Sequence, residues 1–284
     1  MRLVAVVLSW NGREDTLRAL ESLRGVETVL VDNGSTDGSP EAVEERFPEV
    51  EVIRTGANLG FAGGNNVGIR RALDNGAGWV LLLNNDAWID PGLPAALERA
   101  ARARPGAGVL ACKVFLADPP DRLWYAGMRL SKTLGLHRHV GFGKPDAGFD
   151  ALREVVSATG AAMAVSRAAL ETAGLLDEGL FAYAEDLEWC LRIRRSGFEI
   201  VFVPDARTWH RVSASTGGAS SPTGLYYDTR NTIAVVDRHL PLPRPLRSIR
   251  RGAIVAAHVA QRPRAARHVL RGWRDVRRGR MGRR

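Results

Sequence analysis

The sequence predicts an α/β fold with a mostly parallel central sheet, and three observations lead to this prediction. Apolar, β-branched runs alternate with helical segments through the first hundred residues, which is the pattern of βαβ units. Polar clusters rich in Asn, Asp and Gly follow these runs directly. The 45% apolar fraction of the 284 residues can supply the core of one large domain or of two closely joined ones.

The first elements follow from local patterns, in chain order. Residues 3–9 form an apolar β-branched run typical of a strand, and leucines at helical spacing then predict a helix over 14–24. The next apolar run predicts a strand over 27–31. Proline is favoured at the start of a helix, so Pro40 begins the helix that leads to a strand over 51–54.

A glycine-rich loop over 58–66 leads into a helix over 67–75, and the strand that follows organises the rest of the chain. Residues 79–83 are an unbroken apolar run, as in a strand covered on both faces. The polar triplet 84–86 comes directly after this run, before a helix over 94–103. Ligands of open α/β sheets bind beyond the carboxyl ends of the strands, so we expect the triplet to face a ligand.

The second half of the chain is less regular. Residues 117–150 are rich in Gly, Pro, Asp and aromatic residues, which predicts loops and short strands. Apolar runs predict strands over residues 108–114, 155–165 and 199–203. Helical patterns predict helices over 166–172 and within 181–196, the second of which ends at Gly197.

The two cysteines and the absence of a long apolar stretch predict a cytoplasmic protein, free or peripheral on the inner face of the cell membrane. Cys112 and Cys190 lie in apolar surroundings and are expected to be core thiols in a reducing compartment. The apolar run at residues 3–8 is too short for a signal peptide, and no segment approaches the roughly 18 apolar residues of a membrane span.

The positive charge belongs to the end of the chain. Residues 241–284 carry 14 arginines and one acid, a net charge of +13, so residues 1–240 carry −4 of the total of +9. Pro263 divides this tail into two segments with apolar stripes at helical spacing. The stripes are Ile249, Ala253, Ala256 and Ala260 in the first segment and Val269, Trp273 and Val276 in the second. A basic amphipathic helix suits an anionic membrane surface; the alternatives are a solvated, partly disordered end and, less favoured, a nucleic-acid-binding tail.

Asp86 and His210 are the candidate metal ligands. Asp86 ends the triplet that begins with Asn84 and Asn85, and oxygen donors of this kind suit Mg²⁺ or Mn²⁺. His210 follows the last predicted strand and adds an imidazole nitrogen, with diphosphate oxygens able to complete the site. The alternatives are a turn cap for the triplet and a structural histidine next to Trp209.

Two further clusters point to a nucleotide site and a general base. Asp32 ends a strand in a loop of small residues, where its carboxylate could accept hydrogen bonds from a nucleotide base or a ribose, or form an Asx-turn. The glycines of 60–64 permit close backbone approach to a ligand, without the spacing of a Walker or dinucleotide motif. Glu185 and Asp186 begin a helix, either as capping acids or with Asp186 as a general base for an acceptor hydroxyl.

Eight segments between residue 3 and about residue 236 form a recognisable series. They read VVLSWNGREDTLRALESL (6–23), VDNGSTDGS (31–39), NLGFAGGNNVGI (58–69), LLLNNDAWIDPG (81–92), SATGAAMAVSR (157–167), GLLDEGLFAYAEDLEWCLRIRRSG (174–197), WHRVSAS (209–215) and YYDTRN (226–231). Together, and in this order, they resemble the family-2 glycosyltransferases of the GT-A fold, close to their bacterial rhamnosyltransferase-like branch.

The resemblance implies an inverting transfer of a sugar from a nucleoside diphosphate donor, with Mg²⁺ or Mn²⁺ as cofactor. By position, Asp32 matches the base-binding aspartate, Asp86 and His210 the metal ligands, and Asp186 the catalytic base. The expected donor-binding residues are Ser9, Asn11, Asp32, Asn33, Asn58, Gly60, Asn65, Asn85 and Asp86. The residues expected in or behind the acceptor site are Gly160, Glu185, Trp209 and Arg230. Arg230 could contact a phosphate, or be an ordinary surface or ion-paired arginine.

The resemblance also divides the chain into a nucleotide-sugar-binding half (1–115), an acceptor-binding and catalytic half (116–236) and a basic amphipathic helical tail (237–284). It favours dTDP-rhamnose as donor, with UDP-sugars next, and a cell-envelope glycan or lipid-linked acceptor. Asn84 stands where the family's metal motif has its first acid, and Glu188 where an aspartate is frequent. Both substitutions keep an oxygen donor at the position. They therefore leave the expected reaction class unchanged and bear only on the affinity for the metal.

Two alternative functions are compatible with the same kind of fold. A sugar nucleotidyltransferase usually carries a Gly-rich, Lys- or Arg-bearing phosphate loop after its first strand, where this chain reads SWNGRED (9–15). A non-catalytic nucleotide-sugar-binding protein would have no need of Asp86, Asp186 and His210 together. Both alternatives are therefore less favoured than a glycosyltransferase.

Overall fold

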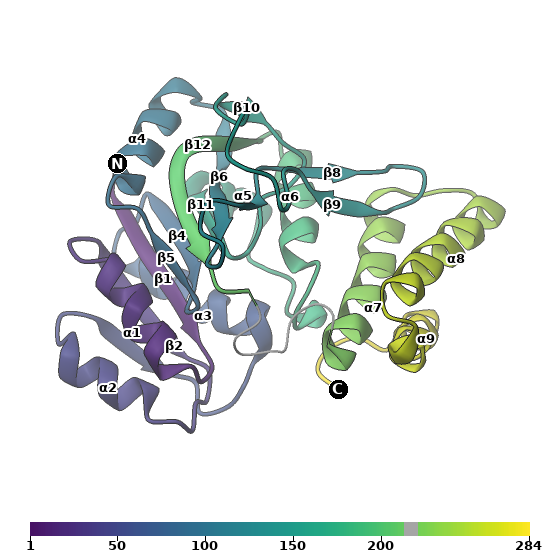
Figure 1. The fold of residues 1–284 in the computed structure, drawn as a ribbon, viewed down its shortest axis with the longest axis horizontal. Coiled ribbons are helices and arrows are strands. Elements are labelled where there is room, and N and C mark those ends of the chain that lie inside the picture. Colours follow the sequence, from purple (N-terminus) through teal and green to yellow (C-terminus); the bar gives the residue numbers. More distant parts are fainter. Residues whose placement is uncertain (213–220) are drawn as a thin grey trace.

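The computed structural model describes residues 1–212 and 221–284 and has the predicted α/β architecture (Figure 1). The strands are β1 (Leu3–Ser9), β2 (Glu27–Asp32), β3 (Glu51–Arg54), β4 (Trp79–Asn84), β5 (Ala87–Ile89), β6 (Ala107–Leu116), β7 (Leu123–Tyr125), β8 (Met128–Leu130), β9 (His137–His139), β10 (Arg153–Glu154), β11 (Ala162–Ser166) and β12 (Glu199–His210). One large sheet has the order β10–β12–β6–β11–β4–β1–β2–β3, with β5 beside β12 and β7 beside β6. β8 and β9 form a separate hairpin.

Helices cover the sheet, and the helices at the end of the chain lie together beside it (Figure 1). The helices are α1 (Arg13–Ser22), α2 (Ser39–Arg46), α3 (Gly60–Asp74), α4 (Leu93–Ala103), α5 (Arg167–Ala173), α6 (Glu185–Arg195), α7 (Pro222–His239), α8 (Arg244–Gln261) and α9 (Ala266–Arg277). Parallel crossovers are right-handed. α1 and α2, which lead from β1 through β2 to β3, therefore lie on the face opposite α3, which leads back to β4.

The four strands β3, β2, β1 and β4 are parallel, as the sequence predicts. Ser9 at the end of β1 lies opposite Asp32 at the end of β2, and Leu8 lies opposite Asn84 at the end of β4. The polar residues that follow these strands therefore gather at one edge of the sheet. This convergence confirms the arrangement expected from the sequence.

The last strand is longer than predicted. β12 continues through Pro204 to His210 instead of ending at Val203. Its pairing with β6 shifts register between Val203 and Arg207, and a proline is tolerated in a strand at such a bulge because no ladder hydrogen bond is required there. β12 then pairs with the short strand β5, which the sequence pattern did not reveal.

The predicted strand over 155–165 is wrong in its first half. Only β11, from Ala162 onward, is a strand, and it runs antiparallel between β4 and β6. The backbone before it is buried as a loop whose polar groups bond to side chains: Tyr125 Oη donates to Ser157 O (2.6 Å), and Ala158 N donates to Cys190 Sγ (3.3 Å). A buried apolar run thus looks the same in the sequence whether it is a strand or a loop.

The glycine-rich segment 58–66 is mostly helix rather than loop, since α3 begins at Gly60. A Cβ at Gly64 would lie 2.4 Å from Leu8 Cδ1, and one at Gly68 would lie 2.3 Å from Val6 Cγ1. These glycines therefore let α3 pack closely on β1, and the expected approach to a ligand does not apply to Gly64. Close packing against the sheet compensates for their low helix propensity.

The tail forms α8 and α9, separated at Pro263 as predicted, but only the first of its two apolar stripes is exposed. The second stripe is covered by protein, because Val269 is fully buried and α9 packs along α7. Over residues 244–260 of α8, the buried side chains are Arg250, Ile254 and His258. The predicted first stripe lies on the other side of α8 and faces solvent, with Ile249 65% exposed. Arg250 is not on a polar face, since its guanidinium bonds to Asp237 (2.8 Å) inside the α7–α8 contact.

Two other expectations can be compared with the structure. Cys112 and Cys190 are free and buried, as predicted, and burial raises the pKa of each thiol to about 12. Within residues 1–212 and 221–284, every helix is too short or too polar to cross a bilayer. The expected boundaries after residues 115 and 236 fall inside β6 and α7, so the three-part division of the chain stays a proposal about function.

Candidate functional site

Asp32 lies in a tight turn at the carboxyl end of β2. Its side chain is 5% exposed, and Oδ1 accepts a hydrogen bond from the backbone N–H of Ser35 (3.0 Å). This is the Asx-turn considered from the sequence. The turn fixes the carboxylate at the sheet edge where the other polar clusters meet, so the structural role and an expected ligand role are compatible.

Asn33 connects the end of β2 to the start of α3. Its Nδ2 donates to Asn58 Oδ1 (3.3 Å) and Gly60 O (3.1 Å), and its Oδ1 accepts from Leu59 N (2.9 Å). Asn58 Oδ1 also accepts from Gly60 N (2.8 Å). These side chains determine the path of residues 58–60, which we call the donor loop. Asn65, deeper in α3, is buried, and its Nδ2 donates to Phe61 O of the same helix (3.0 Å).

Asn85 bonds to the turn that follows β1. Its Nδ2 donates to Asn11 O (2.8 Å) and to Thr16 Oγ1 (3.0 Å), which is also 3.0 Å from Ser9 Oγ. Asn11 has a left-handed backbone (φ 60°) and donates from its N–H to Ser35 Oγ (2.8 Å). Asn85 and Ser9 therefore hold the turn after β1 in place through hydrogen bonds within the protein.

Asp86 and His210 meet at the same edge of the sheet. Asp86 Oδ1 lies 3.0 Å from His210 Nε2, and both side chains are buried. The pairing of β12 with β5 brings them together, because it places His210 opposite Ala87. Asn84 Nδ2 lies 3.5 Å from the same imidazole nitrogen. The sequence predicted this pair, and the structure shows that it is close enough to share one ligand.

The Asp86–His210 pair fits a divalent metal. A carboxylate oxygen and an imidazole nitrogen are suitable donors for Mn²⁺ or Mg²⁺. In the part of the chain that the structure describes, no third His, Cys, Asp or Glu joins them in a metal-binding group. The remaining coordination positions would therefore be filled by oxygens of a bound diphosphate or by water.

Trp124 and His139 form an outer layer around His210. The Trp124 ring meets His210 edge-on at 4.8 Å between centroids and His139 at 4.4 Å. His139 Nδ1 lies 3.1 Å from Trp124 O. Burial lowers the pKa of His139 to about 4, so it is neutral at pH 7 and can donate this hydrogen bond. Neither residue was predicted, because they belong to the irregular segment 117–150, which carries no motif.

Trp209 faces away from the Asp86–His210 pair. Its ring stacks on Phe115 (5.6 Å) and Trp88 (6.5 Å), and its Nε1 donates to Pro120 O (3.1 Å). Trp209 therefore packs β12 against its neighbours and supports His210 from behind. The end of the motif at 209–215 lies outside the described residues.

Asp186 is half-buried in the first turn of α6. Its Oδ2 accepts from Gly160 N (3.0 Å), in the buried loop before β11, and its Oδ1 accepts from Leu187 N (2.7 Å). Burial raises the pKa of Asp186 above the ordinary aspartate value, and these two hydrogen bonds oppose the rise. A carboxylate with a raised pKa is a stronger base than an exposed aspartate, which suits a general base.

Glu185 is a different kind of carboxyl group. It is 6% exposed, and its Oε2 has no hydrogen-bond partner among the described residues. Burial and the nearby charge of Asp186 raise the pKa of Glu185 well above the ordinary value of 4.5. Two adjacent carboxylates in one buried site resist double ionisation, and of the two Glu185, whose pKa is raised further, holds its proton more strongly than Asp186, the expected base.

The loop that precedes Asp186 and the helix α6 has an unusual backbone conformation. Residues 179–184, which we call the base loop, include three non-glycine residues with left-handed backbone, namely Phe181, Tyr183 and Ala184. Asn231 of α7 stabilises this path. Its Nδ2 donates at 2.7–2.8 Å to the carbonyl oxygens of Leu180, Ala182 and Tyr183. Asn231 was not predicted as a site residue, although the YYDTRN motif contains it.

Arg230 is not a surface arginine, it has no acidic partner within residues 1–212 and 221–284, and its donors are engaged by protein atoms instead of being left for a phosphate. It is fully buried, and its guanidinium donates to Leu180 O (3.0 Å), Gly282 O (2.7 Å) and Asn231 Oδ1 (2.8 Å). These carbonyl oxygens accept hydrogen bonds from the N–H groups of the guanidinium that a phosphate would need as donors. Arg230 therefore positions the base loop together with Asn231.

A second acidic group lies close to Asp186. Asp228 of α7 is near enough to Glu185 and Asp186 to affect both electrostatically. Its Oδ2 lies 2.9 Å from His258 Nε2 of α8. Although burial alone would lower the pKa of His258, the bond to Asp228 raises it above 6.5. The basic tail thus supplies a partner for an acid behind the site, which sequence spacing could not show.

Glu188 does not belong to the site. It is 2% exposed and bonds to Arg192 (2.9 Å) and to His239 Nε2 (3.0 Å). Burial opposes ionisation, but these two partners lower the pKa of Glu188 to about 2. The departure from aspartate at this position therefore concerns the attachment of α6 to α7 and has no bearing on a metal.

The donor loop and the base loop are in direct contact. Phe61 N, at the start of α3, donates to Phe181 O (2.7 Å). Gly60 has φ +78°, and a Cβ there would lie 2.4 Å from the Phe181 ring. Gly160, the partner of Asp186, packs on the Phe61 ring, since a Cβ would lie 2.7 Å from it. The structure thus brings the expected nucleotide cluster and the expected base to adjacent positions.

Comparisons with known proteins place the sequence in a family. The sequence profile described as Glycosyl transferase family 2 matches residues 4–172. An N-acetylglucosaminyl-diphospho-decaprenol L-rhamnosyltransferase of Mycobacterium tuberculosis is 31% identical over 257 residues, which is 83% of each chain. The dTDP-rhamnosyl transferase RfbF of Shigella flexneri is 26% identical, over 87% of this chain and 84% of that protein.

Solved structures share the fold. The mannosyltransferase PcManGT of Pyrobaculum calidifontis, in complex with GDP-Man and Mn²⁺, has a TM-score of 0.60 and 19% identity, over 95% of this chain and 74% of that one. GalNAc-T7 with UDP, GalNAc and Mn²⁺ has a TM-score of 0.65 and 17% identity, over 88% of this chain and 54% of that longer one. At this level of identity the likeness concerns the fold alone, and it confirms the expected GT-A fold.

Proposed function

The chain belongs to glycosyl transferase family 2, and from this membership we propose that it is a metal-dependent, inverting glycosyltransferase. Its donor is a nucleoside diphosphate sugar, and its acceptor is a hydroxyl of a cell-envelope or lipid-linked glycan. The observation that carries the proposal is the buried Asp86–His210 pair, with 3.0 Å between Oδ1 and Nε2, at the sheet edge where Asp32 also lies.

The proposed roles follow from the geometry. Asp32 and the donor loop bind the nucleoside and its sugar. Asp186 takes the proton of the acceptor hydroxyl as that oxygen attacks the anomeric carbon. The bond to the diphosphate breaks on the opposite face, so the configuration at the anomeric carbon is inverted. A divalent metal held by Asp86 and His210 would neutralise the leaving diphosphate.

The donor is proposed to be dTDP-rhamnose, with a UDP-sugar as the second choice. Support comes from relatives named as rhamnosyltransferases, one of which is named for a decaprenol-linked acceptor. A sugar nucleotidyltransferase receives no support, because the turn after β1 is used to bond Asn11 to Asn85 and Ser35.

Thermal stabilisation by nucleotides tests the donor site first. A ligand that binds only the folded state raises the melting temperature, Tm. We expect dTDP or UDP to raise Tm with Mn²⁺ or Mg²⁺ and to do so less with EDTA. Asp86→Asn should lose the metal-dependent part, whereas Asp205→Asn, an exposed aspartate (69% side-chain exposure), should not. No shift for any nucleotide would overturn the proposal.

Sugar transfer then separates an enzyme from a non-catalytic binder. We expect Asp186→Asn to keep the nucleotide-dependent Tm shift and to lose transfer by about 10²- to 10⁴-fold, the usual contribution of a general base. Glu185→Gln, which mimics the protonated form of Glu185 itself, should lose much less. Equal activity of Asp186→Asn and the wild type would remove Asp186 as the base.

We propose that the exposed face of α8 attaches the enzyme to an anionic membrane surface. Leu246 and Ile249 are 50% and 65% exposed on one side of this helix. Asp275, the one acid in residues 241–284, is buried, so the arginines of the tail give this layer a positive surface. An apolar stripe flanked by arginines matches the interface of an anionic bilayer. The apolar stripe of α9, by contrast, packs against other helices of the protein.

Vesicle sedimentation tests this attachment. Removing an inserted Leu or Ile side chain costs about 1.5–3 kcal/mol of burial, so we expect Leu246→Ser with Ile249→Ser to weaken binding to phosphatidylglycerol vesicles at least about tenfold. Phe142→Ser changes an equally exposed apolar residue outside the tail (62% exposed) and serves as the control. Equal binding of the double variant and the control would refute the assignment of α8.

A further inference from the structure

The tail does more than present a basic surface, because its last residues reach the two loops of the candidate site. Gly282 N donates to Gly179 O (2.7 Å), and Gly282 O accepts from Arg230 Nη1 (2.7 Å). Arg283 Nη1 donates to Asn58 O (3.0 Å). Residues 281–284, which we call the C-terminal strap, therefore contact the base loop through Gly282 and the donor loop through Arg283.

The strap is attached firmly to the rest of the protein. Met281 packs against the main hydrophobic core. Arg284 N donates to Tyr227 Oη of α7 (2.8 Å), and the Arg284 guanidinium lies 3.5 Å from Asp275 of α9. Gly282 has φ +82°, a left-handed conformation that glycine adopts without strain. These contacts fix the backbone from which the Arg283 side chain extends.

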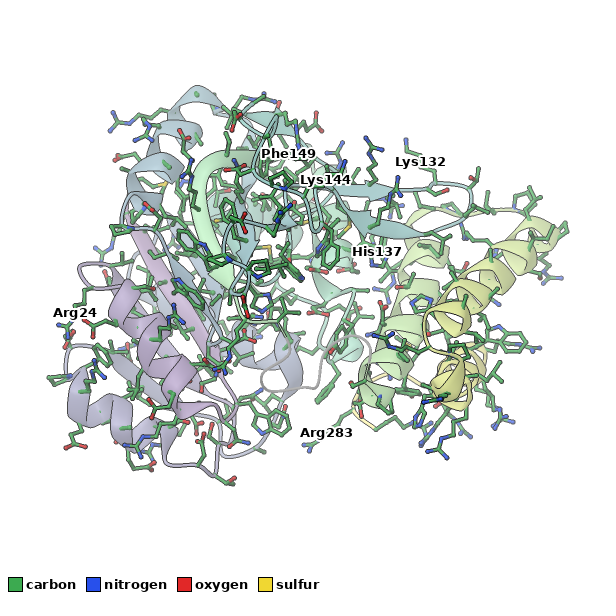
Figure 2. All side chains as sticks on the ribbon, viewed as in Figure 1. Arg24, Lys132, His137, Lys144, Phe149 and Arg283 are labelled. Carbon is green, nitrogen blue, oxygen red and sulfur yellow. The ribbon has the colours of Figure 1, made fainter. Side chains whose placement is uncertain are left out.

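Arg283 occupies a distinctive position at the lower edge of the molecule, between the sheet and the three C-terminal helices (Figure 2). Its side chain is exposed, and its Cζ lies 5.9 Å from the centroid of the Phe181 ring. Asn33 holds the donor loop through its side-chain hydrogen bonds to residues 58–60. The carbonyl of Asn58 accepts its hydrogen bond from the permanently charged guanidinium of Arg283. A charged donor makes a stronger hydrogen bond than a neutral one.

We infer that Arg283 is a positioning residue of the nucleoside diphosphate site. It holds the carbonyl of Asn58, so that the Asn58 side chain can cap Gly60 and meet Asn33. It also brings a positive charge to the rim of a cluster that is proposed to receive a diphosphate anion. This inference rests on the proposed function, and it assigns part of the donor site to a segment that the sequence pattern grouped with the membrane tail.

The test compares Arg283→Ala with Arg278→Ala in the full chain. Arg278 is also an exposed arginine of the tail, and within the part of the chain that the structure describes its side chain makes no hydrogen bond or ion pair with either loop. We expect Arg283→Ala to raise the Kd for dTDP or UDP and the donor KM about three- to tenfold, the range for one partly exposed, charge-assisted hydrogen bond. The acceptor KM and the Tm without ligand should stay at wild-type values. Arg278→Ala should change none of these quantities.

Arg283→Lys separates charge from geometry. Lysine keeps the positive charge and loses the planar fork, so partial restoration of donor affinity, with a stronger dependence on salt, is expected for a positioning residue. Equal donor KM values for Arg283→Ala and Arg278→Ala would overturn the inference. A lower unliganded Tm with an unchanged donor KM would also overturn it, because the contact would then be merely structural. Failure of the wild type to bind any nucleoside diphosphate would instead refute the proposed function itself.

Discussion

The attachment of α6 to α7 through Glu188 leads to a prediction about stability. Glu188 is 2% exposed and is held by Arg192 and His239, and these partners lower its pKa from 4.5 to about 2. Each unit of pKa shift corresponds to about 1.36 kcal/mol, so the shift corresponds to about 3 kcal/mol of folding stability at neutral pH. Glu188→Gln keeps the shape of the side chain and removes its charge, and it should lose about this amount.

The pH dependence gives the prediction its sign. A carboxylate whose folded pKa is lowered stabilises the protein above its unfolded pKa of 4.5, and this contribution is lost as the pH falls toward the folded value of about 2. Urea unfolding should therefore show a gap of about 3 kcal/mol between wild type and Glu188→Gln at pH 7, and a gap of only about 1 kcal/mol at pH 3.

Glu171→Gln is the matched control for this measurement. Glu171 pairs with Arg167 at the same four-residue spacing on a helix, with its side chain 60% exposed. Exposed pairs of this kind are worth less than about 1 kcal/mol. If both variants lose the same stability at pH 7, or if the gap for Glu188→Gln does not shrink in acid, the reasoning from burial is wrong.

Three further predictions concern the two loops. Gly60→Ala should reduce the thermal stability and the nucleotide-dependent Tm shift, because a Cβ would lie 2.4 Å from Phe181, whereas Gly25→Ala, with the same sign of φ and open space, should cost only the local strain. Asn231→Ala removes three hydrogen bonds to the base loop and should lower kcat more than donor affinity in steady-state assays. Burial raises the pKa of Asp186, and because the base must be ionised, kcat/KM should fall on the acid side at a pH above the ordinary aspartate value; an acid limb at or below 3.8 would contradict this.

The sequence determined much of the first half of the chain. β1, β2 and β4 are apolar runs long enough to be recognised, and each is followed at once by polar residues. Since parallel strands end at the same edge, their order along the chain was enough to predict that Asp32 and Asp86 converge. The family-like motifs added the expectation that His210 and Asp186 belong to the same site.

Only the tertiary structure decided which motif residues face a ligand and which support the fold. Arg230 and Asn85 are polar residues in motifs, yet their donors are bound to protein atoms. The glycines of α3 are spaced like a ligand-binding loop, but the closest neighbours of Gly64 and Gly68 are the side chains of β1. Local sequence cannot distinguish these cases, because the partner atoms come from distant elements.

The tail shows the same division between sequence and structure. Its charge and its two apolar stripes can be counted in the sequence, but a stripe does not reveal whether lipid or protein covers it. α7 covers Val269 on α9 and leaves Ile249 on α8 exposed. The long-range contact of Arg283 with Asn58 is likewise a product of how the helices pack, because burial and hydrogen bonding between distant segments are settled by the packing of the whole chain.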